Sequence, residues 1–89
     1  MTTTEQGPET RALAALFRAK RGMLQMSQMT LASITGMSQI SLSRKLKGTS
    51  PITIYEASLI CRALDLNLAE TLAAAIDMAE ANEPPKGEN

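Results

Sequence analysis

The 89-residue sequence contains no histidine, no tryptophan and a single cysteine, and these absences exclude several kinds of site. Transition metals in proteins are held mainly by histidine and by clustered cysteine, so neither a zinc nor a copper site is expected, and we predict no cofactor. Cys61 cannot form an intramolecular disulfide, and the apolar helical pattern around it indicates a buried, unreactive thiol. Phe17 and Tyr55 are the only aromatic residues. The core must therefore consist of Leu, Ile, Met and Ala side chains, which suits packed helices.

Long apolar runs and strand signals are also missing. No run approaches the roughly 20 apolar residues that a membrane-spanning helix requires. The N-terminus lacks the basic segment followed by an apolar segment that marks a secretory signal. No stretch combines alternating β-branched residues with a hairpin turn, so no β-strand is expected. The sequence therefore predicts one small all-α domain that is intracellular and has no membrane partner.

Acidic residues are absent from the segment between Thr10 and Tyr55, although the formal net charge of the whole chain is zero. All nine acidic residues lie outside this segment, together with Arg62 and Lys86. Such segregation of charge points to a polyanionic partner, and the alternative is a chance pattern that only aids solubility. The segment holds seven basic residues: Arg11, Arg18, Lys20, Arg21, Arg44, Lys45 and Lys47.

Two short helices are predicted within this basic segment, joined by a tight turn. Ser27 and Ser38 can each cap a helix N-terminus by accepting a hydrogen bond from a first-turn amide. Gly36 can adopt the left-handed conformation that ends the first of these helices, and Gly48 can end the second. Leu31 and Ile34 are expected to share the buried face of the first helix, with Ala32 beside them.

The second of these helices separates into two faces on a helical wheel. Leu42 and Leu46 form the buried stripe, and a polar, basic set lies opposite. Glutamine can pair with adenine, arginine with guanine, and isoleucine can pack on a thymine methyl group in the major groove of DNA. The alternative is an ordinary solvated face. The outer set consists of Ile40, Ser43, Arg44 and Lys47, with Gln39 at the start of the helix.

Three further helices are expected around this pair. The first opens at Gly7-Pro8-Glu9 and ends between Gly22 and Gln25, with Met23, Leu24 and Met26 covering the core after it. A fourth opens at a capping box of Thr53 and Glu56, and a fifth at a similar pair, Asn67 and Glu70. The apolar stripes of these helices contain Leu13, Leu16 and Phe17 in the first, Ala57, Ile60, Cys61 and Leu64 in the fourth, and Leu68, Leu72, Ala75, Ile76 and Ala79 in the fifth.

A family resemblance rests on the helix pair. The pattern S-Q-x-x-L-A-x-I-x-G-M-S over residues 27–38, followed by L-S-R at 42–44 and by Gly48, resembles the Cro/repressor type of helix-turn-helix, in the lambda-repressor-like XRE family. This resemblance implies a compact five-helix domain over residues 8–82, with the helix-turn-helix at about 27–48. It further implies a phage or bacterial regulator in the cytoplasm of the bacterial host cell. Residues 1–7 and 83–89 are expected to be disordered tails.

The resemblance also implies which residues contact double-stranded DNA. Residues early in the second helix of such a motif contact bases, and the flanking polar residues contact the DNA backbone. The family often has an apolar residue three positions after Leu42, where this chain has Lys45, so the second helix is expected to be slightly rotated. The base-reading residues would be Gln39, Ile40, Ser43 and Arg44, and the backbone contacts Ser27, Gln28, Ser38, Lys45, Lys47, Thr49 and Ser50.

Three classes of function can be weighed on these residues. The first is a sequence-specific DNA-binding transcriptional regulator, a repressor or Cro-like protein. The second is a protein-interaction module, such as the antitoxin of a toxin–antitoxin pair. An enzyme is not expected, because no nucleophile–base pair, carboxylate pair in the basic segment or phosphate-binding glycine loop is present. No small-molecule ligand is evident. The fifth helix either closes the core over the first or pairs with its own copy in a homodimer.

Overall fold

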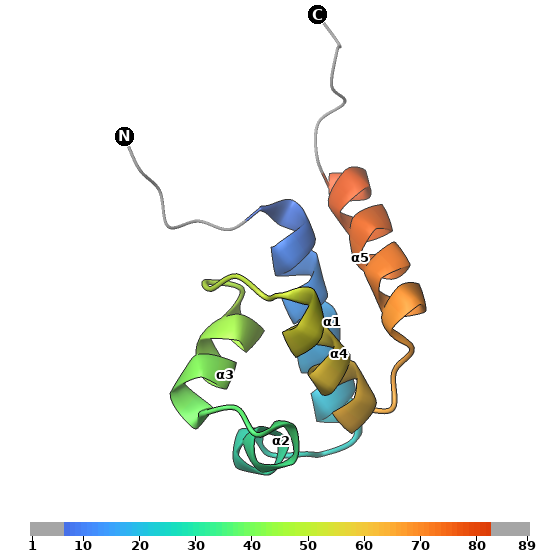
Figure 1. The fold of residues 1–89 in the computed structure, drawn as a ribbon. Coiled ribbons are helices and arrows are strands. Elements are labelled where there is room, and N and C mark those ends of the chain that lie inside the picture. Colours follow the sequence, from blue (N-terminus) through green and yellow to red (C-terminus); the bar gives the residue numbers. More distant parts are fainter. Residues whose placement is uncertain (1–6, 83–89) are drawn as a thin grey trace, which may run out of the picture.

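Five α-helices and no β-strand make up residues 7–82, the part of the chain that the computed structural model describes (Figure 1). This confirms the predicted all-α fold. The tails were predicted at 1–7 and 83–89; residues 1–6 and 83–89 lie outside the described residues, and Gly7 is the N-cap of the first helix. The helices are α1 (Pro8–Met23), α2 (Gln28–Thr35), α3 (Gln39–Lys47), α4 (Ile54–Ala63) and α5 (Leu68–Asn82).

Polar side chains begin four of these helices at the predicted positions. The hydroxyl oxygen of Ser27 accepts a hydrogen bond from the Thr30 amide at 3.0 Å, and that of Ser38 accepts one from the Ser41 amide at 3.1 Å. Thr53 and Glu56 form the full capping box at the start of α4. The side-chain oxygen of Asn67 accepts from the amide of the residue three positions later, at 2.8 Å. Each cap satisfies an amide that the first turn of a helix leaves unpaired.

Two glycines end the helices of the central pair. Gly36 follows α2 with a φ of 76°, and Gly48 follows α3 with a φ of 80°. Both conformations are left-handed, as the sequence predicted, and a side chain at either position would be strained. These two turns fix the lengths of α2 and α3 and the directions in which the chain leaves them.

The core lies where α1 to α4 converge, and α5 closes it from one side. The largest fully buried side chains are those of Phe17, Leu31, Leu42, Leu46, Ile60 and Leu64. Helix α5 packs along α1 and adds the buried methyl groups of Ala75 and Ala79 (Figure 1). The prediction that the fifth helix closes the core over the first is thus confirmed, whereas homodimerisation stays a prediction.

Some apolar residues lie outside the core, contrary to the sequence-based expectation. Ile34 is 56% exposed rather than buried beside Leu31, because α2 meets its neighbours only along a narrow strip that contains Leu31 and Ala32. Met23 is 75% exposed and Leu24 is also exposed, so of the three residues expected to cover the core after α1 only Met26 packs against it.

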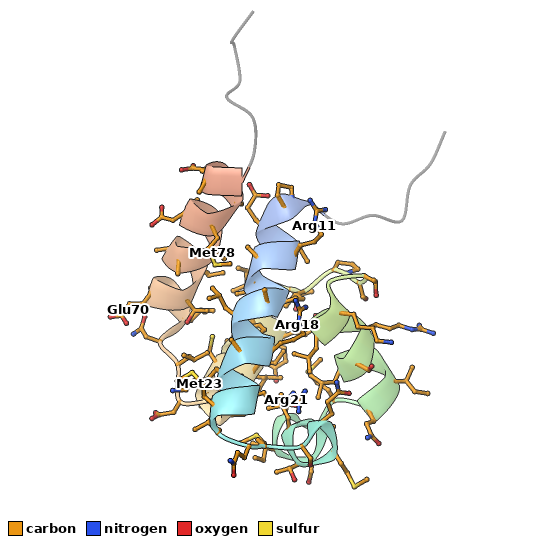
Figure 2. All side chains as sticks on the ribbon, turned by 180° about the vertical axis from the view of Figure 1, so that it is seen from behind. Arg11, Arg18, Arg21, Met23, Glu70 and Met78 are labelled. Carbon is orange, nitrogen blue, oxygen red and sulfur yellow. The ribbon has the colours of Figure 1, made fainter. Side chains whose placement is uncertain are left out.

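Helix α3 lies at the opposite edge of the molecule from α5, with α1 and α4 between them (Figure 1). The views from both sides agree on this arrangement (Figure 2). None of the helices within residues 7–82 combines the length and the hydropathy needed to cross a lipid bilayer. Over the same residues, no three His, Cys, Asp or Glu side chains are grouped in a way that could hold a metal ion.

Candidate nucleic-acid interface

The two faces predicted for α3 are present in the structure. Leu42 and Leu46 are fully buried, and Ile40 on the opposite face is 70% exposed. Arg44 and Lys47 are also exposed. Because Ile40 stays exposed, its side chain contributes little free energy of apolar burial to the stability of the monomer.

A shallow hollow joins the outer face of α3 to the start of α2. Its volume is about 370 Å³. Gln28 comes from α2, and all the other lining residues come from α3. No carboxylate lines it, so nothing at this place repels an anion. The lining consists of all four predicted base readers and two of the predicted backbone contacts: Gln28, Gln39, Ile40, Ser43, Arg44 and Lys47.

Lys45 does not line the hollow. The prediction that it lies on the DNA-facing surface was wrong. Its side chain is buried, and Nζ donates a hydrogen bond to the Pro51 carbonyl oxygen at 3.1 Å. Nζ also lies 3.5 Å from Oε2 of Glu56. The helical wheel contained the signal, since at about 100° per residue position 45 lies only about 60° from Leu42. The long lysine side chain fills the inward position, and Glu56 neutralises its charge.

The remaining predicted backbone contacts lie at the ends of α2 and α3. The Ser27 and Ser38 hydroxyls cap α2 and α3, as described above, and both residues are exposed. Thr49 is exposed and its hydroxyl donates to the Arg44 carbonyl oxygen at 3.2 Å, while Ser50 is half-buried. Hydrogen bonds therefore fix the hydroxyl of Ser27 at the start of α2 and those of Ser38 and Thr49 at the two ends of α3.

Two arginines of α1 hold α2 and α3 in place by hydrogen bonds to backbone carbonyl oxygens. The sequence did not predict this role. Arg18 donates through Nη1 to the carbonyl oxygen of Leu46, in the last turn of α3. Arg21 donates through Nη1 to the carbonyl oxygen of Met26, just before α2, at 2.8 Å. Arg18 therefore places a cation at the C-terminus of α3, where the helix dipole favours it and where the Leu46 carbonyl oxygen has no partner within the helix. The sequence showed only that both arginines lay away from the apolar stripe of α1.

The charge segregation seen in the sequence becomes a segregation in space. Arg11, Arg18 and Arg21 lie along the side of α1 that faces α2 and α3, and Glu70 lies on the far side of α5 (Figure 2). Arg44 and Lys47 extend the positive region across α3, whereas the exposed acidic residues of α5 are at the opposite edge. The molecule thus presents a cationic edge around the hollow and an acidic edge away from it.

Within residues 7–82, two titratable side chains have shifted pKa values. The backbone amide of Thr53 lowers the pKa of the Glu56 carboxyl; partial burial opposes this effect, and the Lys45 ammonium adds to it. Burial raises the pKa of the Cys61 thiol, which keeps it protonated and unreactive. Cys61 is free and buried, as predicted.

Comparisons with known proteins bear on the fold. No protein-family model matches the sequence, and a search of curated proteins finds no match. Among solved structures, the clp gene regulator ClgR from Corynebacterium glutamicum superposes with a TM-score of 0.74. The match covers 82% of this chain and 78% of that chain, at 23% sequence identity. The chain therefore has the all-α fold of this gene regulator.

Proposed function

We propose that this protein is a sequence-specific double-stranded DNA-binding transcriptional regulator that places α3 in the major groove. One observation carries the proposal: the predicted base readers line a single hollow on the exposed face of α3, without a carboxylate among them. These four side chains can each contact a different feature of the base edges. Gln39 suits adenine, Arg44 suits guanine, Ile40 suits a thymine methyl group, and the Ser43 hydroxyl suits either kind of edge.

The dimensions of the groove support duplex DNA over duplex RNA. An α-helix with its side chains is about 10–12 Å wide, and the major groove of B-form DNA is about 12 Å wide. The major groove of A-form RNA is too deep and narrow for side chains to read. The cationic edge around α3 provides the attraction to phosphates that such binding requires, and the acidic edge stays away from the nucleic acid.

The finer assignment is a repressor or Cro-like regulator of phage or bacterial origin, acting in the bacterial cytoplasm. It is supported by the resemblance at residues 27–48. ClgR is described as a gene regulator, which agrees with a regulatory role for this chain. A dimer would read two half-sites about one helical turn apart, whereas a monomer would read one.

Selection of bound duplexes from a random DNA pool tests this function. We expect one sequence to be enriched, with an affinity at least about 10³-fold above that for bulk DNA. A palindromic sequence would indicate a homodimer, and a single half-site a monomer. If no sequence is enriched, the proposal is wrong, and a protein-interaction module such as an antitoxin becomes the better description.

A further inference from the structure

Among residues 7–81, Lys45 is the charged residue that the fold buries most completely, with 7% of its surface exposed. Removing an ammonium group from water is unfavourable until a hydrogen bond or an opposite charge compensates it. Methionine would fill a similar volume without this cost, and replacing a buried ion pair by apolar residues is often neutral or stabilising. Packing alone therefore does not explain the charge at this position.

The contacts of Lys45 show what the charge holds together. Its Nζ bonds the Pro51 carbonyl oxygen and pairs with Oε2 of Glu56, while Oε1 of the same carboxylate accepts from the Thr53 amide at 2.9 Å. We call these three side-chain contacts the Lys45 strut. It connects the last turn of α3 to the end of the 48–53 loop and to the first turn of α4.

The beginning of the same loop is fixed separately. The Gly48 amide donates to the Lys45 carbonyl oxygen, and the Thr49 amide and hydroxyl both donate to the Arg44 carbonyl oxygen. Ser50 lies between the two attachments. The 48–53 loop is thus fixed at both ends to α3, the helix that bears the proposed base readers. When α3 lies in the groove, the position of the loop relative to the DNA backbone follows from these contacts.

We propose that Lys45 and Glu56 are positioning residues for DNA-backbone binding, which hold the 48–53 loop where Ser50 and its neighbours meet a phosphate. The inference rests on the proposed function. Lys45 acts through the Pro51 carbonyl and not by touching DNA. Glu56, the first acidic residue after the basic segment, is neutralised by the buried ammonium and does not repel the phosphate.

Salt dependence separates this role from a direct phosphate contact. Lys45→Met should weaken binding about 10-fold for all sequences. The 48–53 loop is then released, and the charge-assisted hydrogen bond from Ser50 to a phosphate is lost. The slope of log affinity against log salt should stay as in the parent protein in Lys45→Met/Glu56→Gln, because the buried cation and its carboxylate are removed together and no cation has left the DNA surface. Lys47→Ala is the matched control, from the same helix, and should reduce the slope by about 0.9. If Lys45→Met/Glu56→Gln reduces the slope equally, Lys45 is a direct contact and the proposal is overturned.

A double-mutant cycle with Ser50→Ala separates positioning from a merely structural role. Ser50→Ala should weaken binding in the parent protein but have little further effect once Lys45 is replaced, because the loop is then no longer held. Additive effects would overturn the proposal, as would unchanged affinity of Lys45→Met well below its melting temperature. Lys45→Met/Glu56→Gln, which leaves no unpaired charge, gives the same test if the single variant is poorly folded. Absence of DNA binding by the parent protein is a different result and refutes the proposed function itself.

Discussion

On α3, neighbouring positions have opposite roles. Arg44 and Lys47 extend outward, whereas Lys45 between them turns inward to Pro51 and Glu56. Three basic residues within four positions thus have two different environments, because a helix rotates by about 100° per residue. The outward pair is not equivalent either, since an arginine is suited to a bidentate pair with guanine and a lysine acts on phosphate as a point charge.

The first prediction concerns Arg44. Arg44→Ala should lower the discrimination at one base pair of the selected site by about 1–3 kcal/mol, because a bidentate pair with a base edge is lost. Fluorescence anisotropy with duplexes that differ at single positions measures this. Lys20→Ala is a suitable control, since Lys20 lines a groove between α1 and α5, on the other side of α1. If Arg44→Ala discriminates between bases as the parent does, Arg44 is not a base reader.

A second prediction concerns Lys47. Lys47→Ala should weaken binding to every duplex by a similar factor and make binding less sensitive to salt, because a phosphate contact carries no sequence information. Titrations at several salt concentrations, with the selected site and with an unrelated duplex, give both quantities. Loss of affinity for the selected site alone would contradict this role.

Sequence reasoning at the residue scale succeeded where local chemistry decides and failed where a distant partner decides. The outward positions of Ile40, Arg44 and Lys47 follow from the wheel alone. The wheel places Lys45 close to the buried stripe, but its pairing with Glu56, eleven positions later, is not visible in any local pattern. The bracing by Arg18 likewise depends on packing between α1 and α3.

At the scale of single elements, the ends of the helices were more predictable than their buried faces. Caps and left-handed glycines act within three or four residues, so Ser27, Gly36, Ser38 and Gly48 could be recognised from the sequence. The buried face of a short helix is decided by its neighbours. In α2, only eight residues long, the prediction was right for Leu31 and wrong for Ile34.

A third prediction follows from the glycine conformations. Gly36→Ala and Gly48→Ala should each destabilise the fold by about 1–2 kcal/mol, because a side chain in the left-handed region is strained. Gly22→Ala is the matched control, because Gly22 lies within α1 and a Cβ there would meet no atom within 4 Å. Gly22→Ala should leave stability unchanged or raise it slightly. Thermal unfolding followed by circular dichroism compares the three variants, and equal stability of all three would contradict the account of the turns.

A fourth prediction concerns pH and the start of α4. The pKa of Glu56 is lowered in the folded protein, chiefly by the Thr53 amide and then by Lys45. Its contribution to stability is therefore complete above the ordinary glutamate pKa of about 4.3 and is lost as the pH falls through the lower, folded-state value. Glu56→Gln should lower the melting temperature at pH 7, and the difference from the parent should shrink in acid. A difference that stays constant down to pH 3 would exclude this linkage.

On the scale of the whole molecule, the main feature is the separation of charge between two edges. The cationic edge contains the outer face of α3 and the arginines of α1, and the acidic edge contains the exposed carboxylates of α5 (Figure 2). The sequence predicted this separation because the two signs occupy different segments, and the fold keeps those segments apart. The electrostatic field of this charge distribution should orient the protein so that α3 faces an approaching polyanion. This steering weakens as salt is added.

Nuclear magnetic resonance measures directly whether the outer face of α3 contacts DNA. Amide signals of the ¹⁵N-labelled protein are followed while a selected DNA duplex is added. We expect the largest shifts at Gln28, throughout Gln39–Lys47 and at Thr49 and Ser50, and almost none at the exposed amides of α5. Shifts concentrated on α5, with the α3 signals unchanged, would contradict the account.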